Sequence, residues 1–288
     1  MIDVQDLPFR ADLLAGKRAL VTGGGTGLGR AVAKRLGQLG ATVYICGRRE
    51  DVLQASAHAI AVETGATIKP LRCDIRDNAQ VEAVFDAIWA EGALDILVNS
   101  AGANFLARTE SLSPRAFDTI ISIALSGTAY CILAAGRRWI ADKRGGVILS
   151  VLSAGVNSYG RAFTVPLSMA KAAILAMTRG LAVEWGPKGI RCVGIAPGVF
   201  PTPGAFGQLM PEEHLNPNDF IRNIPLGRFG EYNEFANMCA FLVSDAASYV
   251  NGEVVTIDGG RTVKAPDLDD LFAWTDAQWD ALKQARKR

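Results

Sequence analysis

Apolar residues along this chain fall into short, nearly continuous runs separated by longer segments of helical pattern. Such runs are typical of strands that helices cover on both faces of a parallel sheet. The segments between them are long enough for crossover helices, which connect parallel strands with right-handed turns. The pattern therefore predicts an α/β fold with a doubly wound parallel sheet of about seven strands. The predicted strands are Ala19–Gly23, Thr42–Gly47, Ile68–Asp74, Leu94–Asn99, Val147–Val151, Ile190–Ala196 and Val254–Asp258.

Local signals predict two of the helices. Ser113 and Pro114 are typical of an N-cap followed by proline at the first helical position, so a helix is expected from there to about Ile140. A second helix is expected to start near Pro166, with Lys171 about one turn into it. Its apolar residues recur at helical spacing along one face: Leu167, Ala170, Ile174, Met177 and Leu181.

No internal repeat or low-complexity linker divides the 288 residues, so a single domain over 1–288 is expected. Residues 197–225 are rich in proline and glycine and have no clear periodicity, which favours a loop that covers the substrate. Residues 263–288 form an extension in which Trp274, Trp279 and Leu282 favour a terminal helix with one apolar face. Core or oligomer packing is the simpler role for that face, and substrate binding is the alternative.

Composition narrows the classes of function. A formal net charge of +1 gives no broad attraction to nucleic acid or to an anionic membrane, and no run approaches 18 uninterrupted apolar residues. The five cysteines contain no CxxC pair and most lie in apolar stretches, which favours free thiols in a cytoplasmic, reducing compartment. Two histidines without ligand-like spacing make a metal site an unfavoured interpretation. We therefore expect a cytoplasmic protein with small-molecule partners.

A glycine-rich segment follows the first predicted strand and opens a helix. Glycines let the backbone turn sharply and approach a pyrophosphate, whose charge the helix N-terminus then meets. Glycine is common in loops, so it is the strand-turn-helix context that predicts a dinucleotide site. The candidate cofactor-binding residues here are Thr22, Gly23, Gly25, Thr26, Gly27, Leu28 and Gly29.

The end of the second predicted strand bears on the choice of cofactor. An NAD site usually has an acidic residue there that bonds the ribose hydroxyls. This chain instead has Gly47, followed by Arg48 and Arg49, which are suited to clamp a 2′-phosphate. A solvated basic turn is the alternative, but the pattern favours NADP(H), with Arg48 as the better candidate.

Further along the chain come Asn99-Ser100-Ala101-Gly102, then Pro197-Gly198, then Asp258-Gly259-Gly260. With the glycine segment, and in this order, they resemble the landmarks of the short-chain dehydrogenase/reductase family over residues 14–262. The resemblance implies a Rossmann-like sheet of strand order 3-2-1-4-5-6-7, an NAD(P) cofactor and commonly a homotetramer.

The resemblance also implies roles for single residues. Asp74 and Ile75 are expected beside the adenine, and Asn99 is expected to steady the central strand. Lys171 is expected to bond the nicotinamide ribose, and Thr202 to touch the carboxamide. The remaining positions that it assigns to the cofactor are Ala101, Gly102, Pro197, Gly198 and Val199.

The chain differs from the family at the positions that catalyse carbonyl reduction. The usual members carry a tyrosine four residues before the lysine, where this chain has Leu167, and leucine cannot donate a proton. The asparagine of the preceding helix is replaced by Ala124. The family spacing puts the catalytic serine at Leu152, although Ser153 lies next to it. Ordinary ketone reduction is therefore not expected.

Within the family, the chain is similar to the 2,4-dienoyl-CoA reductases and the peroxisomal trans-2-enoyl-CoA reductases. The former also lack the tyrosine at this position, so the departure agrees with the resemblance. The shared segments are the glycine segment, Asn104-Phe105, Gly127-Thr128-Ala129, Val165-Pro166, Ala182–Gly186 and Gly204-Ala205-Phe206. An acyl-CoA-type substrate is implied, and the candidate substrate-binding residues are Asn104, Phe105, Leu167 and Phe206.

Hydride addition to a carbon conjugated with a thioester produces an enolate, which needs hydrogen-bond donors for its oxygen and a proton for its carbon. The candidate catalytic residues are Lys171, Tyr159, Ser153 and Ser168. Tyr159 either donates the proton or merely packs in its loop. Three interpretations stay open: an NADPH-dependent enoyl-thioester reductase, a carbonyl or alcohol oxidoreductase with its acid relocated to Tyr159, and a redox-silent NADP-binding protein.

Overall fold

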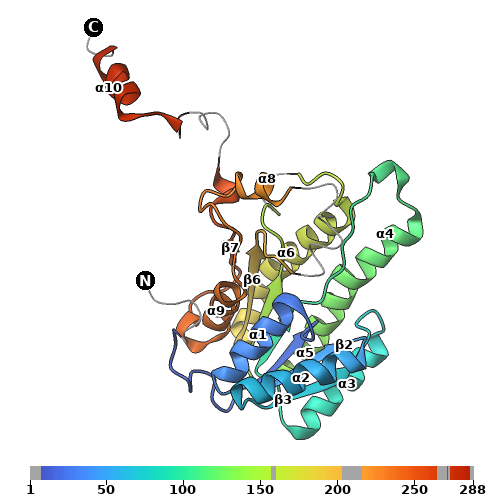
Figure 1. The fold of residues 1–288 in the computed structure, drawn as a ribbon. Coiled ribbons are helices and arrows are strands. Elements are labelled where there is room, and N and C mark those ends of the chain that lie inside the picture. Colours follow the sequence, from blue (N-terminus) through green and yellow to red (C-terminus); the bar gives the residue numbers. More distant parts are fainter. Residues whose placement is uncertain (1–7, 157–159, 203–215, 265–270, 272, 286–288) are drawn as a thin grey trace.

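In the computed structural model, which describes residues 8–156, 160–202, 216–264, 271 and 273–285, parallel strands form one central sheet. Within these residues the sheet has seven strands in the order β3-β2-β1-β4-β5-β6-β7, which confirms the predicted architecture (Figure 1). The strands are β1 (Arg18–Thr22), β2 (Thr42–Gly47), β3 (Ile68–Arg72), β4 (Ile96–Asn99), β5 (Gly146–Val151), β6 (Ile190–Pro197) and β7 (Val254–Ile257).

Helices cover both faces of the sheet because alternate strand residues face opposite sides. On one face, Val21 and Ile45 pack with residues of α1, α2 and α9. On the other face, Leu20 and Leu97 pack with residues of α3, α5 and α6. The longer helices are α1 (Gly27–Gln38), α2 (Glu50–Thr64), α3 (Asn78–Glu91), α4 (Pro114–Ile121), α5 (Thr128–Ala141), α6 (Val165–Trp185), α9 (Tyr232–Val243) and α10 (Asp276–Ala285).

Short turns complete the described chain. The five-residue helix α8 (Pro217–Ile221) lies at the end of the proline-rich loop expected at residues 197–225. Four short 3₁₀ turns connect other elements: η1 (Thr109–Ser111), η3 (Gly186–Lys188), η4 (Asp245–Ala247) and η5 (Arg261–Val263). Residues 203–215 of that loop lie outside the described residues.

The predicted helix from Pro114 to Ile140 is interrupted, which corrects the prediction. Its start is as expected: the Ser113 hydroxyl caps the helix by accepting a bond from Ala116 N at 3.2 Å. The middle of the run, however, is the π-helix η2 (Ser122–Gly127), which separates α4 from α5. A π-turn inserts an extra residue into the ladder, and an apolar pattern alone does not reveal it.

The whole run Pro114–Ala141 is long and apolar enough to cross a membrane by length and composition, but half of its most apolar window is buried within the protein. Cys131, Ala135 and Trp139 of α5 have almost no exposed surface and pack in the core cluster. The apolar composition of α5 thus serves the packing of this helix against the sheet.

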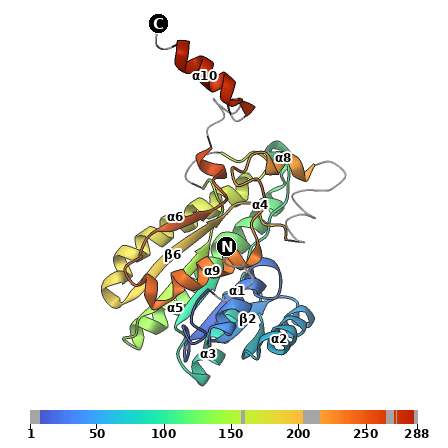
Figure 2. The same ribbon diagram turned by 60° about the vertical axis from the view of Figure 1, so that its left-hand side comes forward.

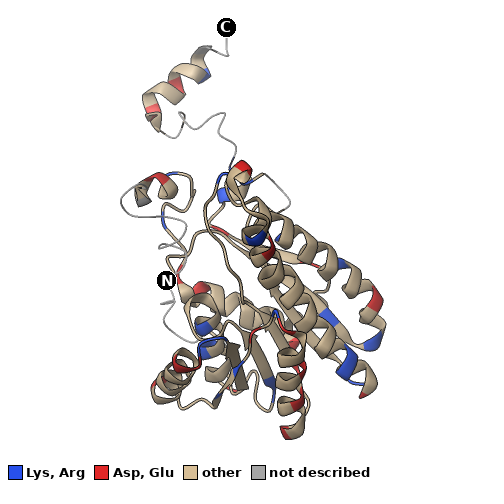
Figure 3. Ribbon diagram, turned by 90° about the vertical axis from the view of Figure 1, so that its right-hand side faces the viewer, with Lys and Arg blue, Asp and Glu red and all other residues tan. Residues whose placement is uncertain are grey.

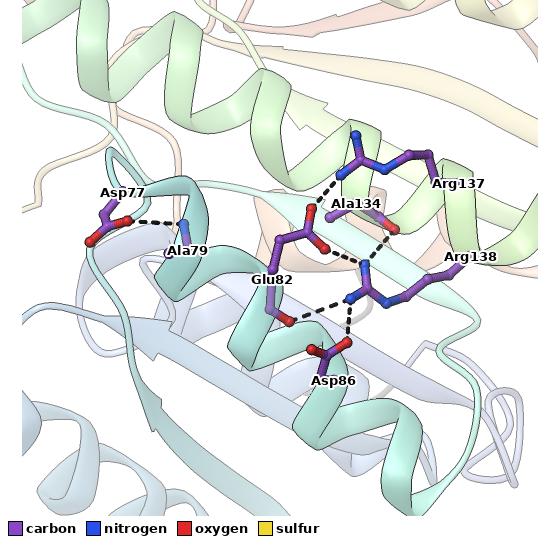
Figure 4. A network of polar contacts seen from close by, with 7 residues as sticks. All are labelled: Asp77, Ala79, Glu82, Asp86, Ala134, Arg137 and Arg138. Carbon is purple, nitrogen blue, oxygen red and sulfur yellow. Dashed lines mark hydrogen bonds and ion pairs between the residues drawn. The ribbon is translucent and has the colours of Figure 1, made fainter.

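Polar contacts fix α5 against α3 (Figure 4). Glu82 accepts bonds from both Arg137 and Arg138, the latter at 2.7 Å, and Arg138 also pairs with Asp86. The start of α3 is capped by Asp77, whose carboxylate accepts from Ala79 N at 2.9 Å. These contacts hold α5, the helix that follows η2, in a fixed position on its face of the sheet.

The C-terminal helix α10 lies apart from the body of the protein in both ribbon views (Figures 1 and 2). Trp274 and Trp279 pack against each other, with ring centroids 5.1 Å apart. The expected terminal helix is therefore present, and the contact between these two tryptophans is made within the extension itself. Charged residues of both signs are interspersed along the body in the view of Figure 3.

Candidate active site

The strand order reverses between β1 and β4, so the connections after these two strands diverge and leave a crevice at their carboxyl ends. The glycine-rich segment follows β1 there and leads into α1. The Thr22 hydroxyl ties the two strand ends together, because it accepts bonds from Ser100 N and Ala101 N, both at 3.1 Å. The structure therefore brings two predicted cofactor segments into one crevice.

Glycine is required in this segment for two reasons. Gly23 and Gly27 have φ values of +68° and +55°, a conformation that side chains disfavour. A Cβ atom on Gly23 would lie 2.9 Å from the Ala101 Cα, and one on Gly29 would lie 2.4 Å from the Gly23 carbonyl oxygen. The backbone is thus packed as closely as a pyrophosphate-binding turn demands.

The first turn of α1 suits an anion. Its N-cap residue, Thr26, makes no side-chain capping bond, and no acidic residue lies in the first turn. The free N–H groups there carry the positive end of the helix dipole. Leu28 is partly buried against the core, and Gly25 lies against Leu53 of α2. These residues fit a dinucleotide phosphate.

The end of β2 carries exposed basic residues and no acid. Gly47 has room for a side chain, since a Cβ there would lie 3.7 Å from its nearest neighbour, a methyl of Leu53. Arg48 and Arg49 are exposed beside it, and Arg49 is the N-cap residue of α2. The arrangement fits a 2′-phosphate at this strand end.

Asp74 lies after β3, next to the predicted adenine position. Its carboxylate is paired with Arg76, whose Nε donates at 2.9 Å, and this hydrogen bond is the main cause of its lowered pKa. Arg48 lowers that pKa further through its charge. Ile75 is buried against Gly127, where a Cβ atom would lie 2.6 Å from it.

Asn99 ends β4 below the crevice. Its side chain is 3% exposed, and neither of its amide atoms has a hydrogen-bond partner. Buried amides without partners are uncommon, so this amide fits a site that a bound molecule completes. Gly102, which follows Ala101, is exposed at the crevice.

The segment after β6 closes the crevice from the other side. A Cβ atom on Gly27 would lie 3.4 Å from the Thr202 Cγ2 atom, so the Thr202 side chain lies beside the glycine turn. Pro197 ends β6, and Gly198 N donates to Ile257 O at 2.9 Å. Val199 accepts a bond from Gly230 N at 3.1 Å. The structure therefore brings Thr202 to the crevice, and Pro197, Gly198 and Val199 precede it at the end of β6.

Lys171 lies between one and two turns into α6, which begins at Val165, next to the predicted start near Pro166. Its Nζ atom donates to Val151 O at 2.5 Å, and burial lowers its pKa to about 8. It lines a pocket with residues of the loop that precedes α6. The described residues lining this pocket are Ser153, Ala154, Gly155, Val156, Gly160, Arg161, Thr164, Leu167, Ser168 and Lys171.

The two adjacent positions that the sequence offers for the serine have different surroundings in the structure. Leu152 is 3% exposed and packs in an apolar cluster with Ile174, Leu175 and Ala196. Ser153 faces the pocket, where its Oγ atom accepts a bond from Arg161 Nη1 at 2.7 Å. The strand end thus directs the serine, and not the leucine, toward Lys171.

Ser168 also lines the pocket, but its hydroxyl donates to Thr164 O at 3.2 Å within the helix. Tyr159 and Phe206, which the sequence suggests for proton donation and substrate binding, lie outside the described residues. Arg161 also lines the pocket, and it is not among the residues that the sequence assigns to the site. Its only signal in the sequence is a basic residue in a loop, which does not distinguish it from surface charge.

The two replaced family positions lie in one apolar cluster. Ala124 of η2 is fully buried with Ile120 and Ala170. Leu167 packs against this cluster, as does Phe105. An apolar wall therefore stands where the resemblance implies an asparagine and a tyrosine.

Asn104, the other predicted substrate residue before α4, has a buried Oδ1 atom without a hydrogen-bond partner. Among the described residues, no group of three or more His, Cys, Asp or Glu side chains is placed to hold a metal ion. The described pocket lining carries hydroxyl, ammonium and guanidinium groups.

Comparison with known proteins agrees with this geometry. Residues 23–262 match a family model described as enoyl-(acyl carrier protein) reductase. An uncharacterised oxidoreductase of Caenorhabditis elegans is 45% identical over 86% of this chain and 80% of its own length. A probable 2,4-dienoyl-CoA reductase (3E-enoyl-CoA-producing) of the same organism is 42% identical, over 88% and 82%.

A solved structure has the same fold. The gluconate 5-dehydrogenase of Burkholderia cenocepacia, crystallised with NADP and tartrate, is 31% identical and superposes with a TM-score of 0.81, over 88% of this chain and 99% of that one. The glycine turn from Gly23 onward and the lysine on α6 lie within the region that the family model matches. The chain therefore belongs to the short-chain dehydrogenase/reductase family of oxidoreductases, which use NAD(P).

Proposed function

We propose that this protein is an NADPH-dependent reductase of a C=C bond conjugated to a thioester, such as a 2-enoyl-CoA or 2,4-dienoyl-CoA, in fatty acid metabolism. The observation that carries the proposal is the apolar cluster of Ala124 and Leu167 beside a retained Lys171. The site keeps the groups that position a nicotinamide and lacks the phenol that protonates an alkoxide.

The cofactor crevice supports the first part of the proposal. NADPH supplies the hydride when it is bound. Arg48 and Arg49 would hold its 2′-phosphate, the first turn of α1 would meet the pyrophosphate, and Asp74 would contact the adenine. Lys171 bonds the nicotinamide ribose, and its second bond, to Val151 O, fixes the direction of the ammonium group.

The walls of the pocket support the second part. Reduction of a ketone needs a proton at the oxygen, whereas reduction of a conjugated C=C bond needs only stabilisation of the enolate oxygen and a proton at carbon. Leu167 and Phe105 offer apolar surface to an acyl chain, and Asn104 offers its unpartnered Oδ1 atom. Phe206 completes the proposed substrate residues, and the relatives named as dienoyl-CoA reductases support this assignment.

The proton at carbon comes from water or from a hydroxyl of the pocket. Ser153, Ser168 and Tyr159 are the proposed hydroxyl donors. Ser153 is better placed than Ser168, because the Ser168 hydroxyl already donates to Thr164 O. Replacing Tyr159 with phenylalanine separates the remaining cases: loss of thioester reduction assigns the proton to Tyr159, and unchanged turnover assigns it elsewhere.

The test of the function is NADPH oxidation with a panel of substrates. The panel contains 2-enoyl-CoA and 2,4-dienoyl-CoA esters of several lengths, and ketones and aldehydes as the contrasting class. We expect turnover with the thioesters and little with the carbonyl compounds. Turnover confined to ketones, and abolished in Tyr159→Phe, would instead establish a carbonyl reductase. NADPH binding without turnover of any compound would reject the proposal in favour of a redox-silent protein.

We also propose a cytoplasmic homotetramer. The five cysteines lie among the described residues and are all free and buried, which suits a reducing compartment. Light scattering coupled to size-exclusion chromatography measures the assembly, and a mass of one or two chains would reject the tetramer. Fractionation of the source cells checks the compartment.

A further inference from the structure

Two cationic side chains line the pocket beside α6, and no Asp or Glu is among its described lining residues. Lys171 is one of them, and it donates to Val151 O. Arg161 is the other, and it enters from the loop that precedes α6. The described lining therefore holds a second cationic group besides Lys171, which favours a substrate that bears or develops negative charge.

The loop that carries Arg161 is fixed on the side that leads into α6. Phe163 adopts a φ of +63°, which L-residues rarely do, and its carbonyl oxygen accepts a bond from Ala107 N at 3.1 Å. The next residue, Thr164, is buried and accepts the Ser168 hydroxyl bond at the start of α6. Strained backbone of this kind is kept where the surroundings fix it, as at functional sites.

The bond between Arg161 and Ser153 sets the direction of the serine proton. The guanidinium donates to the Ser153 Oγ atom at 2.7 Å, so this oxygen acts as the acceptor in that contact. The serine O–H group is then directed away from Arg161 and is able to donate to a second partner. A guanidinium beside a hydroxyl donor is the arrangement that holds an oxyanion.

We propose that Arg161 and Ser153 bind the thioester carbonyl oxygen of the substrate and stabilise it as it becomes an enolate. The inference rests on the proposed function. The substrate carbon remote from the thioester gains a hydride with its electron pair. The C=C electrons then move toward the thioester carbon, and the thioester oxygen takes the negative charge. The carbon next to the thioester carbonyl then takes a proton from water or from a pocket hydroxyl other than Ser153, and the thioester carbonyl re-forms. The substrate is thereby reduced while NADPH becomes NADP⁺.

The experiment compares Arg161→Gln, Arg161→Lys and Ser153→Ala with wild type, using crotonyl-CoA and the N-acetylcysteamine thioester of crotonic acid. Arg179→Gln is the matched control, because Arg179 is exposed on α6 and does not line the pocket. Loss of one oxyanion donor typically lowers kcat by about 10²- to 10³-fold. We expect a loss of this size in kcat for Arg161→Gln with both thioesters, a smaller one for Arg161→Lys, and none for Arg179→Gln.

Two further measurements separate catalysis from structure. NADPH affinity, followed by fluorescence, is expected to stay within about twofold of wild type, because Arg161 makes no contact that the cofactor needs in this scheme. Added guanidinium is expected to restore activity to Arg161→Ala in a saturable way. If Arg161→Gln does not fold, Ser153→Ala tests the same pair and is expected to lower kcat for both thioesters.

The outcomes that overturn the inference are distinct from failure of the proposed function. Wild-type turnover of both thioesters with unchanged kcat in Arg161→Gln and Ser153→Ala would refute the oxyanion role alone. A loss confined to the CoA ester would assign Arg161 to the phosphates of coenzyme A, and would likewise refute it. A wild-type enzyme inactive on every thioester would reject the proposed function and this inference with it.

Discussion

Ala124 of the π-helix η2 and Leu167 of α6 belong to one apolar cluster, in which Leu167 packs against the buried core of Ile120, Ala124 and Ala170. The resemblance implies an asparagine and a tyrosine at these two positions. A polar group at either one would face apolar neighbours supplied by the other. The two replacements are therefore physically linked, and together they turn a proton-donating wall into one that accommodates hydrocarbon.

Restoring one of these polar side chains alone should lower the free energy of unfolding. Ala124→Asn places an amide in a fully buried position among Ile120 and Ala170, and an unsatisfied buried polar group costs about 1–3 kcal/mol. We expect urea denaturation to show a loss of about 2 kcal/mol in the free energy of unfolding. Ala172→Asn on the exposed side of α6 is the control and should cost roughly 0.5 kcal/mol through helix propensity. Equal losses in the two variants would contradict the apolar character of the cluster.

The cofactor preference is expected to depend on the residues at the end of β2. A charged hydrogen bond to a phosphate contributes about 1.5–3 kcal/mol, so Arg48→Gln should weaken NADPH binding by about 10- to 100-fold and leave NADH binding nearly unchanged. Arg49→Gln should have the smaller effect. Gly47→Asp introduces the acid that NAD sites carry, and the space around Gly47 accepts its side chain.

Fluorescence titration with both cofactors measures these effects. Gly47→Asp is expected to reverse the order of the two affinities, because the carboxylate repels the 2′-phosphate and bonds the free ribose hydroxyl. A parallel loss of NADPH and NADH affinity in Arg48→Gln would contradict a phosphate contact. Such a parallel loss would indicate instead that the adenine side of the site is disturbed, where the charge of Arg48 lowers the pKa of Asp74.

Burial of Lys171 predicts a pH dependence of stability. Burial lowers its pKa from 10.5 to about 8, so below pH 8 both the folded and the unfolded chain hold the proton and the cost of the buried charge is complete. Between pH 8 and 10.5 the unfolded chain binds more protons than the folded one, and the contribution of Lys171 to stability therefore rises with pH.

The comparison is wild type against Lys171→Met, because the other titrating groups cancel in the difference. The advantage of the methionine variant in free energy of unfolding is expected to be largest near pH 7 and to shrink toward pH 10 in urea denaturation without cofactor. Leu175→Met, a buried neighbour on α6 that does not titrate, should differ from wild type by a constant amount. A constant difference for Lys171→Met as well would show that the ammonium is not buried as described.

Much of the fold follows from pattern because its signals are local. Apolar runs located the strands, with ends that differ by one or two residues; β1 begins at Arg18, and β3 ends at Arg72. The strand order followed from the family resemblance. The glycine segment and the basic end of β2 were equally evident, since a turn and a charge at a strand end are properties of adjacent residues.

The part that sequence did not predict depends on the direction of side chains. The π-helix η2 changes the helical period within a run that remains apolar throughout, so hydrophobicity does not record it. Whether Leu152 or Ser153 faces Lys171 depends on how the backbone turns after β5. Arg161 becomes part of the site because it lines the pocket and bonds to Ser153 across a loop, which the sequence does not record.

The close packing of the glycine segment predicts the effect of substituting Gly29. A Cβ atom on Gly29 would lie 2.4 Å from the Gly23 carbonyl oxygen, which belongs to the backbone and is not able to rotate away. Gly29→Ala must therefore displace the turn, and overpacking of this kind costs about 1–3 kcal/mol. The displaced turn is the one expected to bind pyrophosphate. The loss in binding free energy for NADPH should therefore be at least as large as the loss in free energy of unfolding.

Gly180→Ala is the matched control, since Gly180 lies in α6 and a Cβ atom there meets nothing within 4 Å. Alanine in a helix interior is favoured over glycine by about 1 kcal/mol, so this variant should be more stable than wild type with unchanged NADPH affinity. Thermal unfolding and fluorescence titration measure the two quantities for both variants. A Gly29→Ala protein that binds NADPH as wild type does would show that the turn is not the pyrophosphate site.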